Sequence, residues 1–235
     1  MDQMDKGFSP KDLLIPGAII VAGIILAVAI YIVRVNHNVV HGTGTVDAVR
    51  PVTPNDHFIG NPSAPVAIIE YADIDSNYAK SFQMTMEQLM TEHASDGKVV
   101  WVYRHFPLTT QHPNSATHSL AAECAASLSV PTTFFRFIDA IQAAAPGDNE
   151  FNPDNYLPIV GQFGIDLEKF KKCVNDGVFT KKVHDDYDNA LATGATASPF
   201  IVLVVQGEKP RTITGAIPYS ALKKIVDDAI IKSGS

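Results

Sequence analysis

Hydrophobic and polar positions follow different periods in different parts of this chain. Residues 66–75, VAIIEYADID, form an almost unbroken run of apolar and β-branched side chains, which is typical of a central strand buried on both faces. Residues 77–94 place apolar side chains three and four positions apart, which predicts an amphipathic helix. Residues 98–106, KVVWVYRHF, form a second apolar run. A strand, a helix and a strand at this spacing predict a right-handed βαβ unit with parallel strands.

The second half of the chain is first helical and then β-rich. Residues 115–192 carry helical periods over most of their length, whereas residues 199–206 and 210–217 form two short apolar runs typical of a hairpin. An amphipathic stripe in YSALKKIVDDAIIK predicts a closing helix. This order predicts an α/β thioredoxin fold with an inserted helical domain. We expect residues 58–114 and 193–235 to form the thioredoxin-fold domain and residues 115–192 to form the insertion.

The amino-terminal part of the chain is apolar on every side. Residues 13–33, LLIPGAIIVAGIILAVAIYIV, contain no charge over 21 positions, and a helix of this length spans roughly 30 Å. A cleaved signal peptide is the alternative, because AVA at 27–29 resembles a cleavage site, but the apolar run is too long for one. We expect an uncleaved signal anchor with one transmembrane helix, after a cytoplasmic flank over residues 1–12 and before a polar linker over residues 34–57.

Charge limits the orientation and the partners. Lys6 and Lys11 precede the apolar segment and Arg34 and Arg50 follow it, so the positive-inside rule gives nearly a tie. The short amino-terminal flank favours a single-pass protein of the cell membrane with residues 34–235 on the extracytoplasmic side. A net charge of −7 without a long basic run argues against a nucleic-acid partner. No histidine or cysteine spacing indicates a metal site, and we expect no cofactor.

Four motifs resemble DsbA-like proteins of the thioredoxin superfamily, and they occur in the order in which that family carries them. They are GNPSAPVAIIEYADID at 60–75, YRHFPL at 103–108, AAECA at 121–125 and TGATASPF at 193–200. The resemblance covers residues 55–232 and favours the membrane-anchored bacterial DsbA-like oxidoreductases. It implies a family reaction of thiol–disulfide exchange in protein disulfide formation. It also implies extracytoplasmic unfolded or cysteine-containing polypeptides as partners.

The two positions that carry this reaction in the family are not cysteines here. The family uses a Cys-x-x-Cys at the start of the first helix, where the helix amino terminus stabilises a thiolate. Mapping that motif puts Ser76 at the attacking position and Ala79 at the resolving position, with Asn77 and Tyr78 between them. A hydroxyl cannot form a disulfide and alanine has no reactive atom, so dithiol exchange at this site is excluded. We therefore expect a redox-inactive protein that retains a peptide-binding groove, and whether it is an enzyme stays open.

Two alternatives remain open at this point. The chain can be an inactivated form of an active disulfide oxidoreductase in which the two cysteines were replaced by Ser76 and Ala79. It can also be a serine-dependent glutathione-binding enzyme in which the hydroxyl of Ser76 activates a bound thiol. No base is evident beside Ser76, so an ordinary helix N-cap is the favoured role of this residue.

The resemblance also assigns two further pairs of residues. Ser198 and Pro199 correspond to the family's cis-proline loop, whose backbone pairs with substrate peptide, so we expect Pro199 to be cis and the pair to line the groove. Cys124 and Cys173 correspond to a structural disulfide within the insertion. An isolated cysteine pair outside the cytoplasm usually bridges. Closing a loop of about 50 residues stabilises a protein by about 4 kcal/mol in the chain-entropy model.

Overall fold

The computed structural model describes residues 44–93, 95–145, 151–213 and 215–234 of the chain. The predicted transmembrane anchor at residues 13–33, its flank and the first part of the predicted linker lie outside the described residues. Within the described ranges, no helix is long and apolar enough to cross a membrane.

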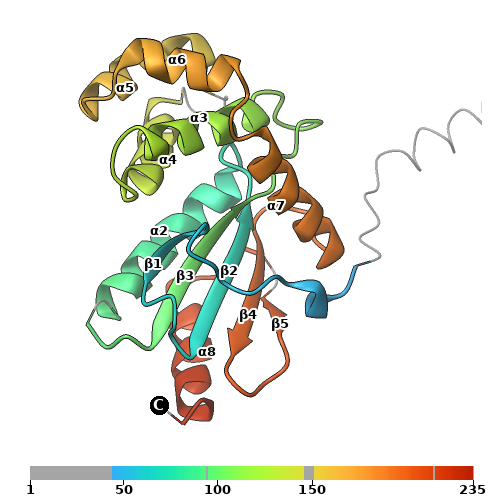
Figure 1. Cartoon of the computed structure of the whole chain (residues 1–235). Helices are drawn as coiled ribbons and strands as arrows, with labels where there is room; N and C mark the ends of the chain where they lie inside the picture. The colour runs from blue at the N-terminus through green and yellow to red at the C-terminus, as the bar shows by residue number, and fades with distance from the viewer. Residues whose placement is uncertain (1–43, 94, 146–150, 214, 235) are drawn as a thin grey trace, which may run out of the picture. The chain divides into compact units, whose positions relative to one another are not determined.

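A five-stranded mixed sheet forms the centre of the described domain, with the strand order β1-β3-β2-β4-β5 (Figure 1). The strands are β1 (His57–Gly60), β2 (Val66–Ala72), β3 (Val99–His105), β4 (Phe200–Val205) and β5 (Arg211–Ile213). Strands β2 and β3 are parallel, and the other neighbouring pairs are antiparallel. Every residue of β2 and β3 is buried, as their continuous apolar runs predict.

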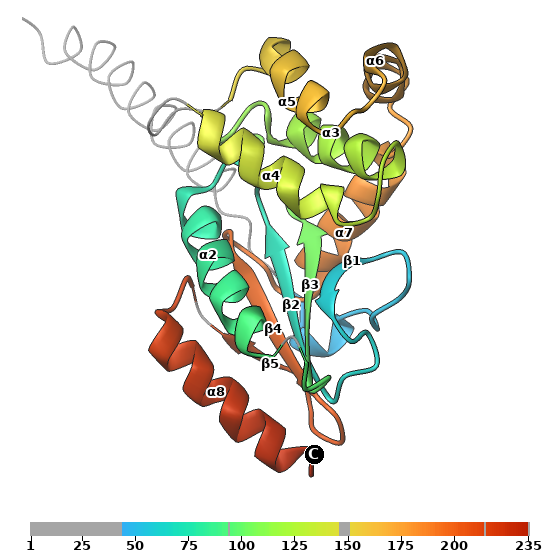
Figure 2. The same ribbon diagram turned by 90° about the vertical axis from the view of Figure 1, so that its left-hand side faces the viewer.

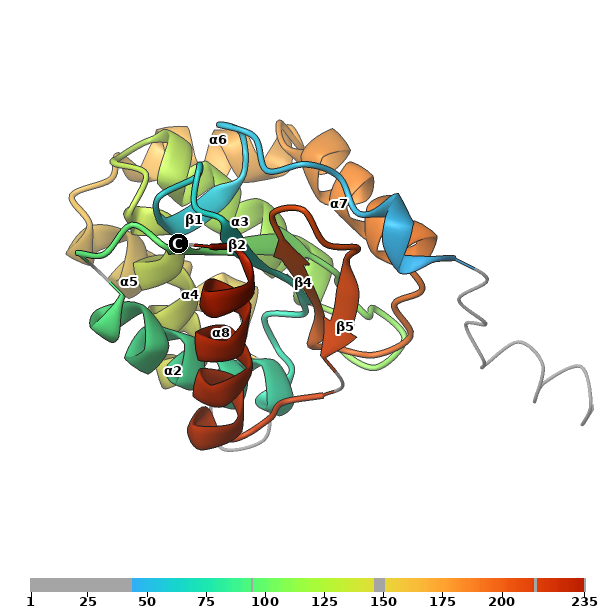
Figure 3. The same ribbon diagram turned by 90° about the horizontal axis from the view of Figure 1, so that it is seen from below.

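Helices cover both faces of this sheet. The described helices are α2 (Asn77–Glu92), α3 (Ser115–Ser127), α4 (Thr133–Ala144), α5 (Tyr156–Gln162), α6 (Leu167–Asn175), α7 (Thr180–Ala192) and α8 (Tyr219–Lys232), with short 3-10 turns at Val46–Ala48 and Pro153–Asn155. Helices α2 and α8 lie on one face and α7 lies on the other, whereas α3 to α6 gather beyond one end of the strands (Figures 2 and 3). The order of elements is that of an α/β thioredoxin fold with a helical insertion, as predicted.

The alternation of side chains in the strands divides the apolar core into two layers. Ile68 of β2 and Trp101 of β3 are paired in register and belong to the layer under α2 and α8. The next pair, Ile69 and Val102, belongs to the layer under α7. The sheet is thus covered by an apolar layer on each side, and α2 begins a few residues after the carboxyl end of β2.

The described end of the predicted linker, residues 44–57, is folded onto the domain rather than free of it. The buried guanidinium of Arg104 donates hydrogen bonds to the carbonyl oxygens of Arg50 (3.1 Å) and Pro51 (2.9 Å). The same guanidinium pairs with the carboxylate of Asp56 at 2.8 Å. The polar, irregular composition of this segment predicted a free tether. No local sequence pattern indicated the docking, because Arg104, the cation that binds the segment, comes from β3 about 50 residues further along the chain.

Candidate functional site

Ser76 begins helix α2 as its N-cap, which is the role that the sequence favoured. Its extended backbone lets the side-chain oxygen accept a hydrogen bond from the backbone N–H of Ala79 at 3.4 Å. The Ser76 hydroxyl in turn donates to the carbonyl oxygen of Ser198 at 3.3 Å. Both partners are backbone groups. The hydroxyl therefore ties the amino terminus of α2 to the loop that leads into β4.

The Ser198–Pro199 loop lies against the same helix start. The peptide bond between Ser198 and Pro199 is cis, as predicted. The hydroxyl oxygen of Ser198 accepts a hydrogen bond from the backbone N–H of Asp73 at 2.7 Å. Ser198 thus contacts the connection between β2 and α2 through both its side chain and its carbonyl group. The structure brings the predicted active-site positions and the predicted cis-proline loop together.

The exposed part of this site carries no charge. Tyr78, in the first turn of α2, is 73% exposed, and Asn77 beside it is also exposed. On the neighbouring loop, Thr196 and Ala197 are exposed, whereas Ser198 and Pro199 are buried. An accessible aromatic ring among neutral polar groups is the composition typical of the centre of a protein-binding surface. We call the surface formed by residues 76–79 and 196–199 the helix-start surface.

Two carboxylates are buried behind the helix-start surface. Asp73 pairs with Nδ1 of His112 at 3.0 Å and accepts backbone hydrogen bonds from Asp75 (2.9 Å) and from the loop after β3 (2.6 Å). Burial raises the pKa of Asp73, and these hydrogen bonds oppose that increase. Asp75 pairs with Nδ1 of His118 at 2.8 Å. Neither carboxylate and neither imidazole forms a hydrogen bond with the Ser76 hydroxyl, so Ser76 has no general base among the described residues.

A third acid, Glu70, lies in the middle of β2 and was not singled out from the sequence. It is 1% exposed, and its carboxylate accepts a hydrogen bond from Nε1 of Trp101 at 2.9 Å. Burial raises the pKa of Glu70 to about 8, and the hydrogen bond from Trp101 opposes this increase. The signal that could have identified it is the single carboxylate inside an otherwise apolar strand, because such a group is costly to bury in its charged form.

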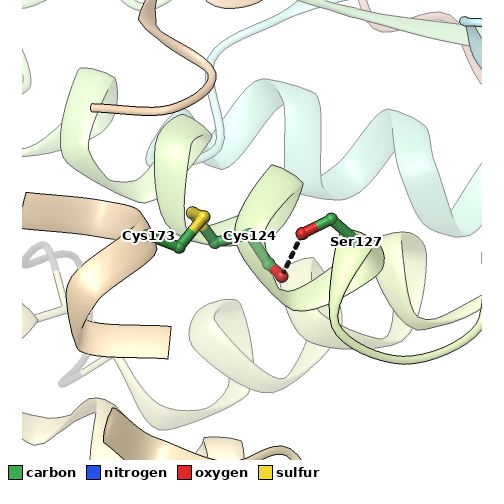
Figure 4. The surroundings of a disulfide bond; sticks show 3 residues. All are labelled: Cys124, Ser127 and Cys173. Atoms are coloured by element: carbon green, nitrogen blue, oxygen red, sulfur yellow. Dashed lines mark hydrogen bonds between the residues drawn. A yellow bond between two sulfur atoms is a disulfide. The ribbon is translucent and has the colours of Figure 1, made fainter. Parts of the chain in front are cut away.

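The two cysteines lie in the helical insertion, away from β2 and β4. Cys124 of α3 and Cys173 of α6 form a disulfide with a Cα–Cα distance of 5.9 Å (Figure 4). Both cysteines are buried, and the hydroxyl of Ser127 donates to the carbonyl oxygen of Cys124 at 2.9 Å. The predicted pairing is confirmed. Because the chain contains two cysteines and both are in this bond, no thiol is left to attack a substrate disulfide.

Within the described ranges, no group of three or more histidine, cysteine, aspartate or glutamate side chains could hold a metal ion. The helix-start surface offers backbone groups, neutral polar side chains and the exposed aromatic ring of Tyr78.

Comparison with other proteins places this geometry in a family. A thioredoxin family model matches residues 52–228. The structure is similar to that of α-DsbA1 from Wolbachia pipientis, with a TM-score of 0.67 and 21% identity over 80% of this chain and 98% of that chain. It is also similar to DsbA2 from Pseudomonas aeruginosa, with a TM-score of 0.64 and 23% identity over 74% of this chain and 94% of that chain.

Among curated proteins, the chain is similar to a part of larger membrane transporters. It is 29% identical over 157 residues to the Na(+)/H(+) antiporter NhaA 3 of Salinispora tropica, and the match covers 66% of this chain and 23% of the antiporter. The chain thus spans about a quarter of the length of the curated relatives that it matches. Because the family model covers well over half of the sequence, the chain belongs to the thioredoxin family, and its structural neighbours are DsbA-like thiol–disulfide oxidoreductases.

Proposed function

We propose that this chain is a DsbA-like, membrane-anchored binding protein that holds unfolded or cysteine-containing polypeptides at the helix-start surface without exchanging disulfides. One observation carries the proposal. Ser76 and the Ser198–Pro199 loop keep hydrogen-bonded contact at the start of α2, while both cysteines of the chain are joined elsewhere. These contacts support a role in holding a polypeptide, and the absence of a free cysteine supports a role without disulfide exchange.

The helix-start surface supports binding in two ways. Tyr78 offers a large accessible ring, and aromatic side chains dominate the energetics of many protein interfaces. Pro199 directly precedes β4, so an extended peptide beside it could pair with backbone groups in the manner of an added strand. Both contributions need shape and backbone hydrogen bonds rather than a thiol.

An extracytoplasmic position belongs to the same proposal. The disulfide between Cys124 and Cys173 supports it, because disulfides persist in oxidising compartments and are rare in reducing ones. The uncharged apolar run at residues 13–33 supports anchoring in the cell membrane. Protease accessibility of the domain in intact cells and in inverted vesicles tests the orientation, and digestion only in inverted vesicles would contradict it.

Binding is tested with the full-length chain in mild detergent and a fluorescent, reduced and unfolded polypeptide as the probe. Replacing Tyr78 with alanine should weaken binding at least fivefold, since losing a central aromatic contact costs about 1 kcal/mol or more. The matched control is Ile231→Ala, because Ile231 is equally accessible (75% exposed) but lies near the end of α8. Absence of binding to the wild type, or equal loss in both variants, would overturn the proposal.

Redox competence is tested with the double variant Ser76→Cys/Ala79→Cys in insulin reduction and in oxidative refolding of a reduced substrate. The wild type should be inactive in both assays, because it has no free thiol. Activity in the variant alone would show an oxidoreductase scaffold silenced at these two positions, as the alternative of an inactivated enzyme requires. Inactivity of both the wild type and the variant would show that the helix-start surface differs from that of an active oxidoreductase at more than positions 76 and 79.

A further inference from the structure

Strand β1 leaves an unpaired edge on the side of the sheet opposite to β5. It is the terminal strand of the sheet, and β3 is its only partner among the described strands (Figure 2). In an antiparallel pair, alternate residues of an edge strand turn their N–H and C=O groups away from the partner strand. Among the described residues, none of these groups in His57–Gly60 has a backbone partner on the outer side. The edge is therefore able to accept another strand.

A cavity of about 440 Å³ follows this edge. Three consecutive residues of β1, His57–Ile59, line it on one side, and Phe135 of α4 lies on the other. Because consecutive side chains of a strand point to opposite faces, a cavity lined by three consecutive residues of β1 reaches the outer edge of this strand. Its volume lies in the range of pockets that bind ligands.

Two neighbouring carboxylates line this cavity without an ion-pair partner among the described residues. Glu87 of α2 and Asp139 of α4 line it and contact one another, and Gln83 donates a hydrogen bond to Asp139. Partial burial and the charge of Glu87 raise the pKa of Asp139 to about 6. No lysine or arginine of the described chain forms an ion pair with either acid. Arg136 also lines the cavity, but its guanidinium lies over the ring of Phe163, 5.0 Å from the ring centre.

We propose that this edge binds an extended segment of another polypeptide, which adds a strand beside β1 and places a lysine or arginine between Glu87 and Asp139. Backbone pairing gives such a complex affinity, and the acidic pair gives it a preference for a basic residue. A second copy of this chain fits less well, because it carries a net charge of −7 and would bring like charges to the edge.

The proposed edge site is separate from the helix-start surface. Strand β3 lies between β1 and β2, whereas Ser76 and Pro199 belong to the ends of β2 and β4 on the far side of it. A polypeptide held at the edge therefore does not need the helix-start surface, and the inference does not depend on the proposed function.

Three labelled peptides test the edge site on the full-length chain in mild detergent. The first alternates valine and threonine and has one central lysine, the second has glutamate in place of this lysine, and the third is the lysine peptide with alternate amides N-methylated. We expect the lysine peptide to bind at least tenfold more tightly than the glutamate peptide. We also expect the N-methylated peptide to lose binding, because it cannot complete the backbone ladder. Equal affinities for all three peptides would overturn the proposal.

The double variant Glu87→Gln/Asp139→Asn should weaken binding of the lysine peptide about tenfold and reduce its preference over the glutamate peptide. The matched control is Glu208→Gln/Asp154→Asn, which removes the same charge from two exposed positions away from the cavity. Tyr78→Ala should leave this binding unchanged, which separates the edge site from the helix-start surface. Unchanged affinity in the Glu87/Asp139 variant, or concentration-dependent pairing of the chain with itself that blocks the peptide, would overturn the proposal.

Discussion

Replacing Glu70 with glutamine should stabilise this protein at alkaline pH. Glu70 is fully enclosed in the core and accepts one hydrogen bond, from Trp101. No cation of the described chain forms an ion pair with it. Burial therefore raises its pKa from an ordinary value of 4.5 to about 8 in the folded protein.

The direction of this pH dependence follows from the protonation of Glu70 in the unfolded and in the folded chain. The unfolded chain loses this proton near pH 4.5, whereas the folded chain retains it until about pH 8. The contribution of Glu70 to stability is thus fully present below pH 4.5 and is lost as the pH rises through 8. At about 1.4 kcal/mol per pH unit, the complete loss amounts to about 5 kcal/mol. Glutamine keeps the oxygen that accepts the bond from Trp101 and cannot ionise, so this loss disappears.

Urea unfolding of the wild-type and Glu70→Gln chains at pH 5 and at pH 9 measures the difference. The two proteins should differ by less than about 1 kcal/mol at pH 5, and the variant should be more stable by several kcal/mol at pH 9. The matched control is Glu208→Gln, an exposed carboxylate in the turn after β4, which should show no such pH dependence. An equal difference between wild type and Glu70→Gln at both pH values would refute the reasoning, because Glu70 would then not titrate between them.

Three further predictions concern contacts that hold the domain together. Ser76→Ala should lower the free energy of unfolding by about 1 kcal/mol, since it removes the N-cap of α2, and urea unfolding beside Ser76→Asn as the capping control measures this. Reduction of the Cys124–Cys173 disulfide should lower the free energy of unfolding by about 4 kcal/mol, which urea unfolding with and without reductant measures. An unchanged urea midpoint would contradict the chain-entropy argument. Arg104→Leu should lower the free energy of unfolding by about 3–5 kcal/mol, because Asp56 is left buried without its cation. The same variant should expose the segment before β1 to trypsin, and unchanged protection would show that other contacts hold this segment.

Much of the fold was predictable because its central elements have strong periodic patterns. The continuous apolar runs of β2 and β3 and the apolar stripe of α2 can be recognised directly in the sequence. Strand β1 was not predicted, because HFIG has two apolar residues and becomes a strand only through its pairing with β3. The docked segment before it was missed for a similar reason, since its partner Arg104 lies about 50 residues further along the chain.

The site was predictable in its positions but not in its contacts. A helix start and the motifs around it located Ser76 and Ala79, and the cysteine pair followed from the resemblance. The hydrogen bond from Ser76 to Ser198 joins residues 122 positions apart, and no local pattern reports such a contact. Likewise, the acidic pair of Glu87 and Asp139 forms only because α2 and α4 meet beside β1.

Serine at position 76 limits the ways in which a bound polypeptide could be released from the helix-start surface. A dithiol site has two chemical states, and a polypeptide bound through a mixed disulfide leaves when the second thiol displaces it. The hydroxyl of Ser76 is hydrogen-bonded to a backbone carbonyl and has a single state. Under the proposed function, a polypeptide held there would leave by dissociation alone, and its lifetime on the surface would be set by the off-rate. The helix-start surface has no dithiol whose oxidation state would time that release.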